Sequence, residues 1–78
     1  MQEDQLKQLF QSMADNWQSE VVARRRIADF TGGVISAKTM ANLDSLGEGP
    51  ERFSLGRSIA YPKYPLAEWL LRRALETQ

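Results

Sequence analysis

Four polar side chains are spaced so that a single helix would present them together. At 100° per residue, Lys38, Asn42 and Ser45 fall within about 60° of one another, and Thr39 lies beside them. Asparagine suits adenine, and lysine suits guanine or a phosphate, so this set could contact the base edges of a nucleic acid. Ser36 can cap the same helix, whose first N–H groups are then free for a phosphate. A solvated polar face on an ordinary small helix is the open alternative.

Basic residues further along the chain suit contact with a nucleic-acid backbone. Arg57 follows Gly56 at the tip of a predicted hairpin, where it could enter a minor groove or hold a phosphate. Arg52 and Lys63 flank the same hairpin and are the next candidates for phosphate contact.

The run Arg24-Arg25-Arg26 is a different case, because helical geometry spreads three consecutive side chains through about 200°. Arg24 has Glu20 four residues before it, and Arg26 has Asp29 three residues after it. We therefore expect a surface ion pair for each, and contact of one of the three arginines with phosphate stays open.

The composition excludes several other kinds of chemistry. Cysteine and histidine are both absent from the 78 residues, which removes thiolate metal sites, disulfides and the commonest general base. No pair of carboxylates is gathered by spacing, so we expect neither an enzyme nor a bound cofactor or metal. No apolar run reaches the roughly 20 residues of a membrane span, and the acidic start is unlike a signal peptide, so we expect a cytoplasmic protein.

The net charge is +0, but it is unevenly distributed along the chain. Residues 1–20 hold four acidic residues and one lysine, a net of −3, and the remainder holds nine basic and six acidic residues, a net of +3. The sequence thus predicts a basic body behind an acidic leader.

The elements that must position these residues follow from the apolar periodicity. We expect an α+β fold that is mainly helical, with helices over 3–16, 20–30, 37–46 and 65–76 and a hairpin over 51–62. Residues 1–18 form an added amphipathic helix with the stripe Leu6, Leu9, Phe10 and Met13. This stripe either completes the core of residues 19–78 or binds a partner, as a homodimer or on another protein.

The hairpin has two possible registers. A two-residue loop at Gly56-Arg57 pairs Phe53 with Ala60, whereas a three-residue loop that includes Ser58 pairs Leu55 with Ile59. The second register puts the apolar side chains of both strands on one face, and we favour it for that reason.

The stretch from Ser36 to Trp69 resembles the small DNA-binding domains of the phage excisionase and AlpA-like regulators, which are related to the MerR-type winged helix. The resemblance rests on the order of five pieces: Thr39-Met40-Ala41-Asn42-Leu43, Gly47-Glu48-Gly49-Pro50, Leu55-Gly56-Arg57, Tyr61, and Leu66-Ala67-Glu68-Trp69-Leu70. It implies a winged helix-turn-helix that binds double-stranded DNA specifically, for transcription regulation or phage excision. The recognition helix would enter the major groove, with the wing on the minor groove or backbone. We expect a homodimer or a cooperative array on DNA.

Two acidic residues depart from this pattern. Asp44 and Glu48 stand where such domains often carry a basic residue. Asp44 lies about 120° from Lys38 around the helix, so we expect it to bind an internal arginine or a backbone N–H instead of facing DNA. Asp44, Glu48 and the neutral net charge favour an alternative, in which the domain binds no DNA and contacts a protein through its acidic first helix.

Overall fold

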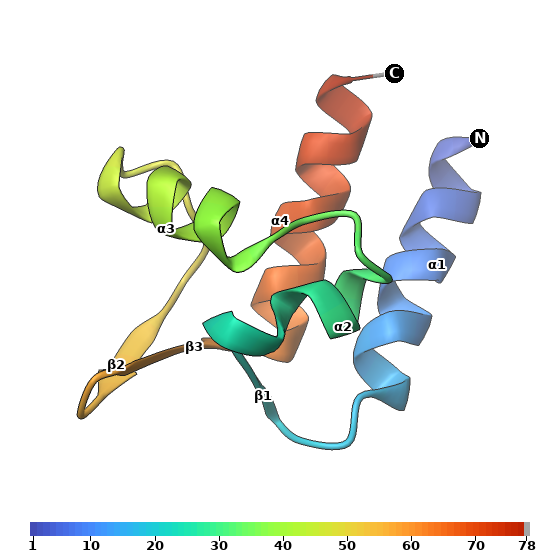
Figure 1. Cartoon of the computed structure of the whole chain (residues 1–78). Coiled ribbons are helices and arrows are strands. Elements are labelled where there is room, and N and C mark those ends of the chain that lie inside the picture. Colours follow the sequence, from blue (N-terminus) through green and yellow to red (C-terminus); the bar gives the residue numbers. More distant parts are fainter. Residues whose placement is uncertain (78) are drawn as a thin grey trace.

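The chain folds into four α-helices and an antiparallel sheet of three strands, in a computed structural model that describes residues 1–77 (Figure 1). The elements are α1 (Glu3–Asn16), β1 (Val21–Ala23), the short 3₁₀ helix η1 (Arg24–Arg26), α2 (Ile27–Thr31), α3 (Ala37–Ser45), β2 (Phe53–Leu55), β3 (Ser58–Pro62) and α4 (Lys63–Glu76). The strand order is β1–β3–β2. The predicted α+β class is confirmed, and β1 is a strand that the sequence interpretation missed.

The helix predicted over 20–30 is wrong in its first half. Val21, Val22 and Ala23 pair with β3 as an edge strand, with Val22 opposite Tyr61. Two adjacent β-branched valines favour an extended backbone, and pairing with β3 buries Val22 completely. The helical part begins with η1 and continues as α2, which ends at Thr31.

The three-residue hairpin loop is also wrong, because Phe53 pairs with Ala60 and Leu55 with Ser58. Gly56 and Arg57 form a two-residue turn, and only Gly56 of the two has a positive φ, at 63°. A positive φ at the first central position alone is the φ pattern of a type II′ turn. The favoured register assumed that Phe53 and Leu55 are buried, but they are 42% and 76% exposed.

Helix α3, the candidate recognition helix, is capped at both ends by local hydrogen bonds. At its start, Oγ of Ser36 accepts from the N–H of Thr39 at 3.1 Å. At its end, Gly47 has a φ of 75°, its N–H bonds to the carbonyl of Asp44, and the N–H of Glu48 bonds to the carbonyl of Leu43. These are the two bonds of a Schellman motif, which ends the helix and redirects the chain toward the hairpin.

Helix α1 packs along α4. Leu6 and Ala14 are buried, and Phe10 and Met13 lie against the core. Leu9, the remaining residue of the predicted apolar stripe, is 45% exposed. The hydroxyl of Tyr64 in α4 donates to Oδ1 of Asp15 at 2.6 Å. The shared core consists of Ala14, Val22, Ile27, Phe30, Met40, Tyr61, Leu66, Ala67, Trp69 and Leu70.

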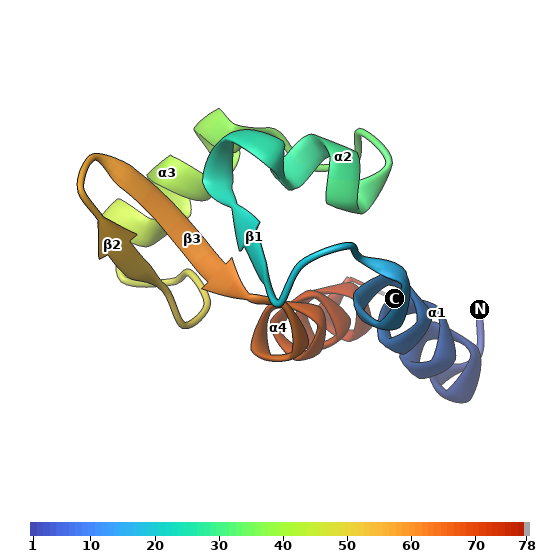
Figure 2. The same ribbon diagram turned by 90° about the horizontal axis from the view of Figure 1, so that it is seen from below.

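The arrangement separates the molecule into two ends. In Figures 1 and 2, α3 and the β2–β3 hairpin lie at one end, and α1 lies at the other. No helix within residues 1–77 combines the length and the apolar composition that crossing a membrane requires.

Candidate nucleic-acid interface

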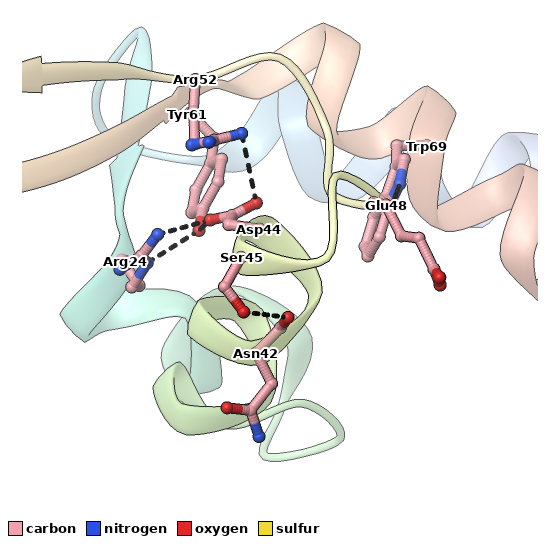
Figure 3. Close-up of polar contacts among 8 residues, drawn as sticks. All are labelled: Arg24, Asn42, Asp44, Ser45, Glu48, Arg52, Tyr61 and Trp69. Carbon is pink, nitrogen blue, oxygen red and sulfur yellow. Dashed lines mark hydrogen bonds and ion pairs between the residues drawn. The ribbon is translucent and has the colours of Figure 1, made fainter.

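The outward side of α3 carries the four polar residues predicted from their spacing. Lys38, Thr39, Asn42 and Ser45 are all exposed, whereas Met40 and Asp44 on the inner side are buried. In Figure 3 the amide of Asn42 points away from the Asp44 side chain. The helix therefore presents a polar surface of mixed donors and acceptors.

Some hydrogen-bonding capacity on this surface is already used within the helix. The hydroxyl of Ser45 donates to the carbonyl of Asn42 at 2.9 Å, and the hydroxyls of Ser36 and Thr39 lie 3.0 Å apart. Ser45 thus keeps only its acceptor lone pairs for an external group.

Residues at the hairpin tip and at the start of α3 line one concavity. Arg57 is exposed at the tip, and a concavity of about 250 Å³ extends from it to η1 and to Ala37, the first residue of α3. The lining residues are Arg24, Arg25, Ala37, Arg57, Ser58 and Ile59. The fold thus brings Arg57 near two residues of the arginine run, which sequence reasoning treated separately.

Behind this surface, Asp44 forms a polar network with three residues, Tyr61, Arg24 and Arg52 (Figure 3). Its Oδ2 accepts hydrogen bonds from the hydroxyl of Tyr61 at 2.6 Å and from Nη2 of Arg24 at 2.5 Å. Nη1 of Arg52 lies 3.8 Å from Oδ1, which is an ion-pair distance but too long for a hydrogen bond. The expectation that Asp44 binds an internal arginine is confirmed.

Arg24 and Tyr61 also bond to each other, with Nε of Arg24 donating to the Tyr61 hydroxyl at 3.1 Å. The bond to Tyr61, together with that to Asp44, raises the pKa of the Arg24 guanidinium above its ordinary value, against the effect of burial. Burial raises the pKa of the Tyr61 phenol, and the nearby Asp44 carboxylate raises it further. At neutral pH Arg24 is therefore a cation and Tyr61 a neutral phenol.

Gly49 is required by the same network. A Cβ at Gly49 would lie 1.8 Å from Oδ1 of Asp44, so no larger residue fits beside the carboxylate without movement. The second glycine of Gly47-Glu48-Gly49-Pro50 thus has a steric cause that the sequence interpretation did not identify.

Of the two ion pairs expected for the arginine run, one forms and the other does not. Arg24 does not pair with Glu20, because its guanidinium turns inward to Asp44 and Tyr61; the predicted pair of Arg26 with Asp29 is confirmed at 2.6 Å. The Tyr61 hydroxyl cannot reach a phosphate at the rim, because the residue is 0% exposed and bonded to Asp44.

Lys63 also has to be removed from the phosphate-contact set. The structure buries it at the start of α4, where Nζ donates to the backbone carbonyl of Trp17 at 3.4 Å and lies 5.3 Å from the ring centroid of Tyr64. The helix begins two residues before the predicted Pro65, and this early start places Lys63 under the end of α1. Arg52 remains exposed, although its head group is drawn toward Asp44.

Glu48 is the second acidic residue that differs from the expected pattern, and its backbone is held by a hydrogen bond. Its carbonyl accepts from Nε1 of Trp69 at 3.0 Å, while its side chain is exposed. In Figure 3 the Glu48 carboxylate lies on the α4 side of the loop and points away from the Asp44 network.

Comparisons with known proteins do not assign this chain to a family. No protein-family model, curated protein or solved structure matches it.

The charge distribution matches the division into two ends. Residues 21–63, which include η1, α3 and the hairpin, hold seven basic and four acidic residues, a net of +3. Residues 1–20, which include α1, have a net charge of −3, and residues 64–78 are balanced. The polar surface of α3 therefore lies at the positive end of the molecule.

Proposed function

We propose that α2, α3 and the β2–β3 hairpin form a winged helix-turn-helix and that the protein binds double-stranded DNA in a sequence-specific manner. The observation that carries the proposal is the outward side of α3. It exposes Lys38, Thr39 and Asn42 at the same end of the molecule as the exposed Arg57, while the acidic residue of the same helix is buried and paired. Burial of Asp44 leaves α3 without an exposed carboxylate that would repel a phosphate.

In this proposal α3 lies in the major groove with its outward side toward the bases. Asn42 reads adenine, Lys38 reads guanine or holds a phosphate, and Ser45 accepts a hydrogen bond from a base amino group. The first N–H groups of α3, next to Ser36, face a phosphate. Arg57 on the wing contacts the flanking minor groove or backbone, and Arg52 contributes a further phosphate contact.

The biological role we propose is that of a cytoplasmic transcription regulator or excisionase-like factor of phage or mobile-element type. The ordered motifs from Thr39 to Leu70 support it by their resemblance to that group. A net charge of +3 over residues 21–63 supplies few phosphate contacts, so one copy binds weakly and with a shallow salt dependence. Specific sites then require a dimer or a cooperative array.

The test is selection of bound sequences from a random duplex library, followed by alanine variants on the selected site. Lys38→Ala and Asn42→Ala should weaken the selected site by about 1–3 kcal/mol each and leave nonspecific duplex binding almost unchanged. Arg57→Ala should weaken binding to the selected site and to nonspecific duplex DNA alike. If all three variants bind the selected site as wild type does, this mode of recognition is excluded.

A second candidate function rests on an apolar groove at the other end. The groove, about 450 Å³, lies between α1, the α2–α3 turn and α4, and Leu9 and Val34 on its border are 45% and 81% exposed. This surface favours a protein-interaction module that uses the acidic helix α1. A heparin column at low salt separates the two candidates, because a module of this kind would pass through without retention.

A further inference from the structure

The concavity between η1, the start of α3 and the hairpin tip has the charge of an anion site. Three of its six lining residues are arginines, and no acidic side chain lines it within the described residues 1–77. Arg25 and Arg57 are exposed, so their charges are free to face a ligand. The nearest carboxylate in the structural network, that of Asp44, is buried behind Arg24 and engaged by it.

Arg24 differs from the other two arginines because it is held in place. Two of its five N–H donors are used by Tyr61 and Asp44, and its side chain is 25% exposed. Its guanidinium is thus a fixed part of the wall, and most of its charge is balanced by Asp44. The uncompensated charge of the concavity comes from Arg25 and Arg57.

The size of the concavity suits one phosphate group. A volume of about 250 Å³ is roughly that of eight water molecules at about 30 Å³ each, which accommodates a phosphodiester and part of its hydration shell. Guanidinium groups match phosphate oxygens in geometry and remain charged at all relevant pH values.

We propose that this concavity binds a single backbone phosphate of DNA, which Arg25 from η1 and Arg57 from the hairpin tip hold jointly. The proposal rests on the proposed function for the identity of its ligand. It assigns a role to Arg25, and it gives Arg57 a phosphate in place of a minor-groove base edge. Ser58, next to Arg57, adds a hydroxyl donor at the rim.

Joint binding of one phosphate differs measurably from binding of two. The salt dependence of affinity for a nonspecific 20-bp duplex is measured for Arg25→Ala, Arg57→Ala and the double variant. Two separate phosphate contacts would reduce the slope of log K against log salt by about 1.8 in the double variant, whereas one shared phosphate reduces it by about 0.9. We also expect each single change to weaken binding about tenfold and the double change by much less than a hundredfold.

The matched control is Arg72→Ala, which removes the same charge from an exposed position on α4. It should leave both the affinity and the slope close to wild type. Arg25→Lys and Arg57→Lys keep the charge and should restore part of the slope but little of the affinity. Additive losses, or an Arg25→Ala variant that binds as wild type does, would overturn the shared site while DNA binding itself stands.

Inorganic phosphate provides a measurement that does not depend on the proposed function. Added to the free protein, it should shift the Nε–H resonances of both Arg25 and Arg57, and Arg57→Ala should abolish the response of Arg25. A response in a protein that ignores duplex DNA would keep the anion site and exclude the DNA-binding function. No response of either arginine would overturn the site.

Discussion

The two ends of this small domain are held together by different kinds of interaction. At the α3 end, a carboxylate, a guanidinium and a phenol hold three elements together, and the apolar side chains of β2 remain exposed. At the α1 end, contact between α1 and α4 depends mainly on apolar packing, with polar contacts from Tyr64 to Asp15 and from Lys63 to the carbonyl of Trp17. Hydrogen bonds and ion pairs fix the positions of α3 and the hairpin, whereas burial of apolar side chains contributes most of the folding free energy.

The largest expected effect is on the polar end. Asp44→Ala should reduce the free energy of unfolding by about 3 kcal/mol, because it leaves Arg24 and Tyr61 without their shared acceptor. Denaturant unfolding followed by circular dichroism measures this loss. Asp29→Ala is the matched control, since it removes a carboxylate from an exposed arginine pair and should cost less than about 1 kcal/mol. Equal losses in the two variants would contradict a special structural role for the buried Asp44 network.

The next effect tests the apolar end with one substitution at two positions of the same helix. Leu6→Ala should cost about 2 kcal/mol, because Leu6 is 6% exposed, whereas Leu9→Ala should cost about 0.5 kcal/mol at 45% exposure. Both are read from thermal unfolding. Neither change should alter affinity for duplex DNA, and a loss of DNA binding in Leu9→Ala would link the two ends.

The smallest effect is expected for Tyr61→Phe, at about 1 kcal/mol near neutral pH, since it deletes one hydroxyl and keeps the buried ring. Its clearer signature is the pH dependence. The folded-state pKa of Tyr61 lies above the ordinary value of 10.0, so the folded protein holds a proton that the unfolded chain releases, and stability falls as pH rises above about 10.

Tyr61→Phe should therefore flatten the loss of stability above pH 10. Tyr64, whose pKa is raised by its hydrogen bond to Asp15, contributes in the same direction, and Tyr64→Phe is the comparison at the apolar end. Unfolding curves at pH 8 to 11 supply the measurement. A steeper alkaline loss in Tyr61→Phe than in wild type would be inconsistent with the network.

The contrast also explains which features were predictable from the sequence. Helix α1 and most of α3 follow local rules of periodicity and capping, and Ser36 and Gly47 mark the ends of α3 as expected. The inward position of Asp44 follows from its angle around that helix. These features depend on neighbours within a few residues.

Features that depend on distant residues were missed. Val21 and Val22 become a strand only because β3, about 40 residues later, offers an edge to pair with. The hairpin register could not be chosen without knowing that nothing covers Phe53 and Leu55. Arg24 finds Asp44 across 20 residues, and Lys63 is buried by a helix far away in the sequence. Periodicity gives no information on any of these partners.

Strand β3 lies between β1 and β2, and this position has a consequence for how the chain acquires its candidate site. One wall of the arginine concavity follows directly from β1, and another is the tip that joins β2 to β3. The site is therefore assembled only when the last-synthesised strand closes on the first. A proteolytic fragment that keeps α3 and the hairpin but lacks β1 and η1 would retain the sequence of α3 without the arginines that line the other side of the concavity. The concavity is thus a property of the complete domain and not of α3 and the hairpin alone.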